Sequence, residues 1–209
     1  MIAYWNSHYV QMIQLMVEHG QMVLSALLIA LSLAIVIVFF FVQKNNWLNG
    51  LTYFFSMLYS IPSYALFALL MPITGLNKTS AIIVLTIYCE YILLRSFITG
   101  IKNVDPQYVE AGRGLGMTSR QIFFKVQLPL ALPSLFSGMQ LALGSTMAIA
   151  TIASTISAGG LGDLLFAGLQ TNNVIPIIWG TILEVVLALF WIMVLQFAKN
   201  LLESDEVKK

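Results

Sequence analysis

Charge is scarce in this sequence. Only 9% of its 209 residues are charged and 59% are hydrophobic, whereas an ordinary soluble domain carries about 25% charged residues. A soluble domain of this size keeps a large share of its surface in water, so it could not hide so many apolar side chains. The composition therefore excludes an ordinary soluble domain and predicts a membrane protein. The net charge of +1 also argues against a nucleic-acid-binding surface.

Cysteine and the motifs of metal and nucleotide sites are also lacking. Cys89 is the single cysteine, so the chain can form no internal disulfide. There is no HExxH motif or Cys/His cluster, and His8 and His19 are interpreted as interfacial polar residues rather than metal ligands. The phosphate-binding pattern GxxxxGK[ST] is absent, and the glycine-rich stretch 158–162 follows no predicted strand. We therefore expect no catalytic residue, metal ligand or cofactor in this chain.

Long apolar runs make up most of the chain. A helix needs about 20 mainly apolar residues to cross the hydrocarbon core of a bilayer, and runs of this length indicate helices rather than barrel strands. Five stretches qualify: 22–42, 51–71, 80–100, 133–156 and 174–198. The sequence therefore predicts an all-α polytopic membrane protein with five transmembrane helices.

The residues before the first apolar stretch are rich in aromatic side chains. Tyr4, Trp5 and Tyr9 recur at near-helical spacing, and such rings favour the headgroup level of a membrane. We expect an N-terminal interfacial helix over 1–18, a transmembrane domain over 19–199 and a cytoplasmic tail over 200–209.

Lysine and arginine divide unequally between the two sides that five spans define. Cytoplasmic loops of membrane proteins carry the excess of these residues. One side receives only Lys78, and Arg95 lies near the end of the third span. The other side receives the remaining eight: Lys44, Lys102, Arg113, Arg120, Lys125, Lys199, Lys208 and Lys209. The sequence therefore predicts a multi-pass cell-membrane protein with its N-terminus outside and its C-terminus in the cytoplasm.

Three charged residues lie inside the predicted spans: Glu90, Arg95 and Glu184. An ionised, unpaired carboxylate at mid-membrane costs about 2.5–3.5 kcal/mol on insertion scales. A neutral glutamic acid bonded to a neighbouring helix is the plainer interpretation, and a gating or solute-holding role is the alternative. Arg95 lies roughly 140° around the helix from Glu90, so the two are not expected to pair, and snorkelling of Arg95 to the cytoplasmic interface is the plainer interpretation.

Small side chains recur every four residues along the fourth span. Close van der Waals packing between helices in lipid uses such rows, so packing against a neighbouring helix is the favoured interpretation. Polar contacts along a solute path are the alternative, with Thr146, Thr151, Ser154 and Thr155 as the candidates. The row consists of Ser134, Gly138, Ala142, Thr146, Ala150, Ser154 and Ala158.

A basic, glycine-punctuated loop separates the third and fourth spans. Asp105 followed by Pro106 predicts a helix start, because the side chain caps free amides and proline suits the first turn. Gly116 predicts the left-handed end of this short helix. Thr118 and Gln121 have the spacing of a capping box, which starts a second short helix. Leu128-Pro129 is expected to stop it, and Pro133 to begin the next span.

Two interpretations of this loop follow from its residues alone. Gly112 and Gly114 are unusual inside a helix, where each costs about 1 kcal/mol relative to alanine, and glycine often permits another surface to come close. The loop either packs against its own helix ends or binds a cytoplasmic partner. Val104, Tyr108, Ala111 and Leu115 are expected to share one face of its first helix.

The loop resembles the "EAA" loop of ABC importer permeases. Glu110-Ala111-Gly112, three residues, Gly116, nine residues and Val126-Gln127-Leu128-Pro129 match the family pattern E-A-A, three residues, G, nine residues, I-x-L-P. The departures are Gly112 for the second alanine and Val126 for isoleucine. Within this family the chain is similar to permeases of osmoprotectant importers, through the stretches 60–63, 100–106 and 157–162, parts of which methionine-type permeases share.

The resemblance implies partners and a mechanism. Two separate ATPase subunits would bind ATP and Mg²⁺, and their closure would move two permeases, identical or sister chains, between inward- and outward-facing states. An extracellular substrate-binding protein would deliver glycine betaine, carnitine, choline or a related solute. The residues implied in ATPase coupling are Glu110, Ala111, Gly112, Gly116, Leu128 and Pro129.

Other functions stay open on the sequence alone. An ion-gradient-driven secondary transporter would use Glu90 or Glu184 as its ion site and would work without an ATPase. An importer of another small solute, such as an amino acid, is a second alternative. A membrane-embedded hydrolase lacks a nucleophile–base pair or a metal set at a suitable spacing.

Overall fold

The computed structural model describes residues 1–42 and 44–207, which contain helices and no strand. Its elements are α1 (Ile2–Phe41), α2 (Asn45–Tyr59), α3 (Ser63–Thr74), α4 (Lys78–Lys102), α5 (Pro106–Gly114), α6 (Ser119–Ile122), the π-helical turn η1 (Phe123–Gln127), α7 (Leu128–Ile152), the 3₁₀ turn η2 (Ala153–Ile156), α8 (Gly162–Gln170) and α9 (Val174–Val207).

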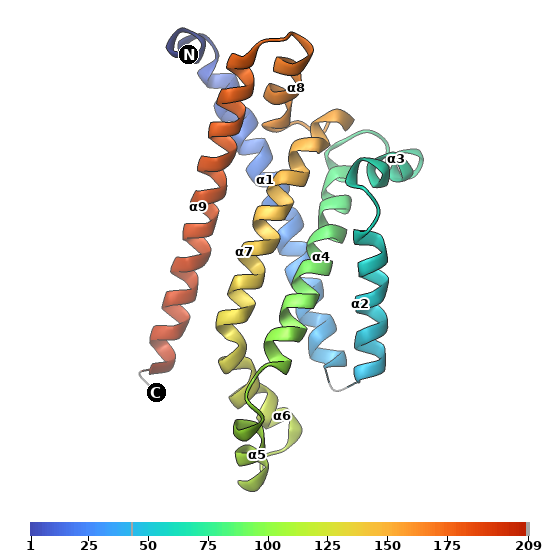
Figure 1. Ribbon diagram of the computed structural model, residues 1–209, viewed down its shortest axis with the longest axis vertical. Coiled ribbons are helices and arrows are strands. Elements are labelled where there is room, and N and C mark those ends of the chain that lie inside the picture. Colours follow the sequence, from blue (N-terminus) through green and yellow to red (C-terminus); the bar gives the residue numbers. More distant parts are fainter. Residues whose placement is uncertain (43, 208–209) are drawn as a thin grey trace.

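The long helices run side by side along the longest axis of the molecule (Figure 1). The N-terminus, α3 and α8 lie at one end, and α5, α6 and the C-terminal end of α9 lie at the other (Figure 1). Within the described residues, 4 helical stretches are long and apolar enough to span a membrane, and a bent pair, 46–59 with 63–74, is the candidate for one more span. The all-helical membrane fold is confirmed.

The second predicted span is not one straight helix. The prediction of a single helix over 51–71 is wrong, because α2 and α3 meet at a bend of 96°. Pro62 lies at the break, where it lacks an N–H and disfavours helical geometry in Ile61 before it. The Tyr88 hydroxyl of α4 donates a hydrogen bond to the Ile61 carbonyl. This bond satisfies a backbone group that the break would otherwise leave unpaired.

The fourth span begins earlier than predicted. Pro129 and Pro133 were expected to end one helix and start another, but helical structure continues through both. In η1 the Leu128 N–H bonds the Phe123 carbonyl, five residues back. We attribute the continuity to this wider turn, which eases the clash that a proline ring makes with the preceding turn.

The N-terminal segment is not a separate helix. No helix boundary lies at residue 18, because α1 is a single helix of 40 residues, and the interfacial position of residues 1–18 stays a prediction. Met12 is fully buried, and the Trp5 ring lies 4.8 Å from that of Trp179 at the start of α9. The segment therefore packs on the bundle. Likewise, the predicted boundary at residue 200 falls inside α9.

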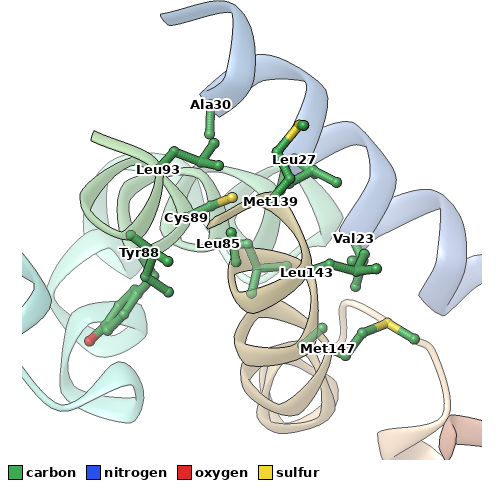
Figure 2. Close-up of a cluster of buried hydrophobic side chains, with 14 of the residues drawn as sticks. Val23, Leu27, Ala30, Leu85, Tyr88, Cys89, Leu93, Met139, Leu143 and Met147 are labelled. Carbon is green, nitrogen blue, oxygen red and sulfur yellow. The ribbon is translucent and has the colours of Figure 1, made fainter. Parts of the chain in front are cut away.

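The core lies between α1, α4 and α7. A Cβ added to Gly138 of α7 would overlap Ser96 of α4, and one added to Gly100 of α4 would lie 2.8 Å from Ser134 Cβ. These two helices therefore approach as closely as small residues allow, which confirms the packing interpretation of the small-residue row. Figure 2 shows the apolar side chains between the three helices, among them Val23, Leu27, Ala30, Leu85, Cys89, Leu93, Met139, Leu143 and Met147.

Candidate functional site

The start of the short helix α5 is capped as the sequence predicts. Asp105 Oδ1 accepts a hydrogen bond of 2.9 Å from the Gln107 backbone N–H, and Pro106 occupies the first turn. Since this helix has only 9 residues, it is too short to be stable alone in water. Its capped start therefore helps to fix its position.

The end of α5 is fixed by a left-handed glycine. Gly116 has a φ of 74°, and its N–H donates to the Arg113 carbonyl at 2.9 Å. The Met117 N–H donates to the Gly112 carbonyl at 3.0 Å. This pair of bonds is the Schellman arrangement, which suits glycine at the left-handed position. The predicted role of Gly116 in the turn is confirmed.

The helix α6 follows at once and packs back on α5. Thr118 and Gln121 form the complete capping box. Gly112 is buried, and a Cβ added to it would lie 3.3 Å from Ile122 and 3.4 Å from the Met117 sulfur. Gly112, the departure from the family pattern, therefore lets the two short helices pack closely.

One face of α5 is apolar and exposed. Leu115 is 82% exposed, Tyr108 is 56% exposed, and Ala111 is exposed as well. Of the four residues predicted on this face, only Val104 is buried. The helices α5 and α6 extend beyond the end of the bundle (Figure 1). An apolar patch that the chain leaves uncovered on a projecting element is typical of a protein–protein contact.

The two predicted intramembrane acids have different surroundings. Glu184 Oε1 of α9 accepts a hydrogen bond of 2.7 Å from the Thr151 hydroxyl of α7, which agrees with a carboxyl group bonded to a neighbouring helix. Glu90 is fully buried, and neither of its carboxyl oxygens has a partner among the residues that the structure describes. A role for either acid in transport stays a prediction.

The predicted path residues differ in exposure and in hydrogen-bond partners. Thr146 is fully buried and bonds the Ala142 carbonyl, whereas Thr155 is exposed and bonds the Ile152 carbonyl. Ser154 donates to the Thr151 carbonyl at 3.1 Å. Their part in a solute path stays a prediction.

A groove lies elsewhere, between α4 and the first half of α7, and several polar side chains line it together with apolar ones. It has a volume of about 500 Å³ and is open to the surface of the chain. Sequence reasoning missed it, because its two walls are 30 residues or more apart and only the fold brings them together. Its lining residues are Arg95, Ser96, Thr99, Gly100, Asn103, Pro133, Ser134, Ser137, Gly138 and Leu141.

The glycine-rich stretch 157–162 is a turn that packs on α1. Gly159 and Gly160 have φ values of 78° and 91°. A Cβ on Gly159 would lie 2.8 Å from Glu18 Oε2, and one on Gly160 would lie 3.1 Å from His19 Nδ1. This stretch therefore connects η2 to α8 and lies against α1.

The prediction for His19 is wrong. It is fully buried instead of interfacial, because the turn 157–162 covers it. His8, by contrast, is half-buried and stacks on Tyr4 at 4.1 Å. Within residues 1–42 and 44–207, no group of three or more His, Cys, Asp and Glu residues could hold a metal ion.

Comparisons with known proteins agree with these features. A family model described as "Binding-protein-dependent transport system inner membrane component" matches residues 26–206. The chain is 34% identical to the carnitine transport permease protein OpuCB of Listeria monocytogenes, over 89% of this chain and 84% of that protein. It is 35% identical to the ergothioneine transport permease/ergothioneine binding protein EgtU of Helicobacter pylori, over 68% of this chain but only 25% of that longer protein.

The fold also has a solved relative. A structure of the MetNI methionine ABC transporter, in inward-facing conformations, superposes with a TM-score of 0.70, and 97% of each chain is covered. The sequence identity is 20%, so this likeness concerns the fold alone.

Proposed function

Because the chain belongs to the family of binding-protein-dependent transport system inner membrane components, we propose that it is the permease subunit of an ATP-driven importer of quaternary ammonium solutes. The observation that carries the proposal is the exposed apolar face of α5, on the loop that matches the family pattern. ATP and Mg²⁺ bind the partner ATPase, and this chain transmits the movement of the ATPase to the spans.

The arrangement of charge supports a cytoplasmic position for α5 and α6. Lys44, Lys102, Arg113 and Arg120 all lie on the helix ends and loops at the end of the bundle that bears α5 and α6 (Figure 1). Lys78 begins α4 at the opposite end. Because cytoplasmic ends are the basic ones, the N-terminus faces outward and the C-terminus inward. The bent pair α2–α3 counts as one of five spans in this topology.

The α5 surface suits an ATPase as its partner. Glu110 is exposed, so its carboxylate is available to a basic or amide group of the ATPase. Leu115 and Tyr108 supply apolar contact area on a different face of the same short helix. The Schellman turn at Gly116 and the capping box hold α5 against α6, so force on α5 reaches α7 through helical backbone. Leu128 and Pro129 begin α7 at the base of this unit.

The solute class follows from the relatives. Carnitine and ergothioneine, which the two relatives transport by name, both carry a trimethylammonium group and a carboxylate. We therefore place glycine betaine, carnitine and ergothioneine among the solutes of this importer, with choline as the member that lacks the carboxylate. An extracellular substrate-binding protein captures the solute, and a second permease copy or a sister permease completes the path.

The test is uptake by purified components. This chain is co-expressed with its ATPase and its binding protein, and the complex is reconstituted in liposomes with radiolabelled glycine betaine or carnitine. The proposal expects uptake that needs ATP inside the liposome and the binding protein outside. Uptake by this chain alone, driven by an ion gradient, would contradict it.

A further inference from the structure

Arg95 lies on the surface of a membrane-spanning helix. It is exposed on α4 and lines the groove between α4 and α7. Among the α4 residues that line this groove, it is the one nearest the N-terminus of the helix. An arginine on a span is costly when it faces lipid, so such residues face water-filled paths or other polar groups. The hydroxyl and amide side chains that line the rest of the groove, including Thr99, Asn103 and Ser137, extend this polar face toward the end that bears α5.

A cluster of tyrosine rings lies directly beside Arg95. The Tyr59 ring at the end of α2 lies 4.7 Å from that of Tyr91 and 5.3 Å from that of Tyr88, both on α4. Tyr88 points out of the apolar core toward α2 and α3 (Figure 2), where its hydroxyl is used by the Ile61 carbonyl. Tyr59 and Tyr91 keep part of their rings exposed.

A hydrogen bond connects the two features. Arg95 Nη1 donates to the Tyr91 hydroxyl at 3.1 Å. Since a guanidinium group has five N–H donors in a planar fork, most of its donors stay available. In the part of the chain that the structure describes, Arg95 has no carboxylate partner within salt-bridge distance. Tyr91 thus holds the guanidinium next to the aromatic rings without neutralising its charge.

The order of these groups forms one stripe on α4. Tyr88, Tyr91, Arg95 and Thr99 are spaced by three, four and four residues, so they lie on one helix face. The two tyrosines of the stripe are near the middle of α4, and the groove lies along the C-terminal part of this helix. At about 500 Å³, the groove falls within the range of small-molecule sites.

We propose that this stripe, together with Tyr59 of α2, is the specificity-determining contact of the solute during its passage. The faces of Tyr59 and Tyr91 attract the trimethylammonium group, as aromatic rings attract quaternary ammonium ions. Arg95 binds the carboxylate at the other end of the solute, through charge-assisted hydrogen bonds. Tyr91 is also a positioning residue, because its hydroxyl orients Arg95. This inference rests on the proposed function and adds to it: the membrane path itself prefers zwitterionic solutes to choline.

The test compares variants in the reconstituted full complex, with glycine betaine as the main solute. Arg95→Gln is expected to lower the rate of uptake about tenfold or more, as loss of a charged hydrogen-bonding partner does. Arg95→Lys keeps the charge and is expected to restore part of that rate. Tyr91→Phe keeps the ring but frees Arg95, and Tyr59→Leu removes a ring, so each is expected to lower uptake about threefold.

Choline and a control variant make the test selective. If the wild-type complex transports choline, Arg95→Gln should affect choline much less than glycine betaine, because choline has no carboxylate. Lys44→Gln removes one positive charge from the same end of the bundle, outside the groove, and should leave both solutes unchanged. Assembly is checked by ATPase stimulation with solute-loaded binding protein, which should be retained in all variants.

The outcomes separate this inference from the proposed function. A wild-type complex that transports none of these solutes would contradict the proposed function. If the wild type transports glycine betaine, then unchanged uptake by Arg95→Gln overturns the inference alone, and so does an equal loss for Arg95→Gln and Arg95→Lys. If Arg95→Gln does not assemble, Tyr91→Phe decides: normal glycine betaine uptake by that variant overturns the inference.

Discussion

The two ends of this molecule carry glycine turns with opposite surroundings. At one end, Gly116 closes α5, and an added Cβ would meet no atom within 4 Å. At the other end, an added Cβ on Gly162 would overlap the Thr151 carbonyl oxygen. The helix that ends at the first turn has an uncovered apolar face, whereas other parts of the same chain pack against the second turn. The same residue type therefore accompanies an uncovered surface in one place and internal packing in the other.

The difference between the turns is one of contacts rather than of backbone shape. Gly116 and Gly160 both have positive φ values, and both turns connect helices. Only Gly160 lies against another helix, where His19 of α1 is its neighbour. Gly116 is thus needed for conformation, while glycine in the turn 157–162 is needed for conformation and for space.

The most severe change should be Gly162→Ala. The new methyl group has no room beside the Thr151 carbonyl, and overpacking of this kind costs about 1–3 kcal/mol. We expect a large fall in the yield of folded protein, measured by size-exclusion fluorescence after heating. Gly144→Ala in α7 is the matched control, since nothing lies within 4 Å of its added Cβ. Equal stability of the two variants would contradict the packed nature of the turn.

The loop at the opposite end should fail in a different way. Glu110→Lys combined with Gly116→Asp reverses an exposed charge and places a side chain at a φ of 74°. We expect uptake by the complex to fall about tenfold or more, as when a charged hydrogen-bonding partner is lost. The isolated chain should keep its thermal stability to within about 1 kcal/mol, because the damage is local. Normal uptake by an intact complex of this variant would contradict a role of the loop in coupling to the ATPase.

A smaller loss is expected from Leu115→Ser alone. The side chain is 82% exposed in the isolated chain, so its removal should leave the stability of the chain unchanged. In the complex the substitution should weaken ATPase binding by about 3- to 10-fold, because part of the free energy of burying a leucine side chain is lost. Titration of the ATPase onto immobilised permease measures this. Unchanged ATPase affinity would show that the apolar face of α5 is not the contact.

Between the two ends, Thr151→Val tests the bond that joins α7 to α9. Loss of its hydrogen bond to Glu184 should lower stability by about 0.6 kcal/mol, the average for such bonds between membrane helices. Thermal denaturation of the purified chain is the measurement. A loss of several kcal/mol would mean that Glu184 is left as a buried unpaired charge.

The smallest effect is a pH dependence at the packed end. Asp163 lies in the first turn of α8 and is exposed overall, but partial burial of its carboxyl group raises its pKa, with the nearby Glu18 as a second cause. The folded chain is thus most stable with Asp163 protonated, and it loses this stability as pH rises from about 3.9 through the raised pKa. Asp163→Asn should be slightly more stable than wild type near neutral pH and equal to it in acid. Parallel melting curves across pH would contradict this.

Local signals in the sequence predicted the α5–α6 loop well. Asp105, Gly116 and the pair Thr118–Gln121 act within four residues of their own positions, and capping depends on such short distances. The apolar runs likewise predicted helices, because a run of about 20 apolar residues satisfies its backbone hydrogen bonds in lipid by forming a helix.

The errors arose where distant segments meet. The bend at Pro62 is stabilised by Tyr88 of another helix, and His19 is covered by a turn 140 residues away in the sequence. Pro129 looked like a helix stop because the wider turn at η1 has no local signature that we recognised. The contact between Tyr59 of α2 and the α4 residues Tyr91 and Arg95 was also missed, since only the fold brings the two helices together.

The most direct measurement is site-specific labelling of Ala111→Cys, on the exposed face of α5. Cys89 is fully buried, so the native thiol should not interfere. In intact cells, an impermeant maleimide should fail to label the new cysteine, and in the purified complex a bismaleimide should cross-link it to the ATPase subunit. Labelling from outside the cell, or a complex that forms no such cross-link while it transports normally, would contradict the account.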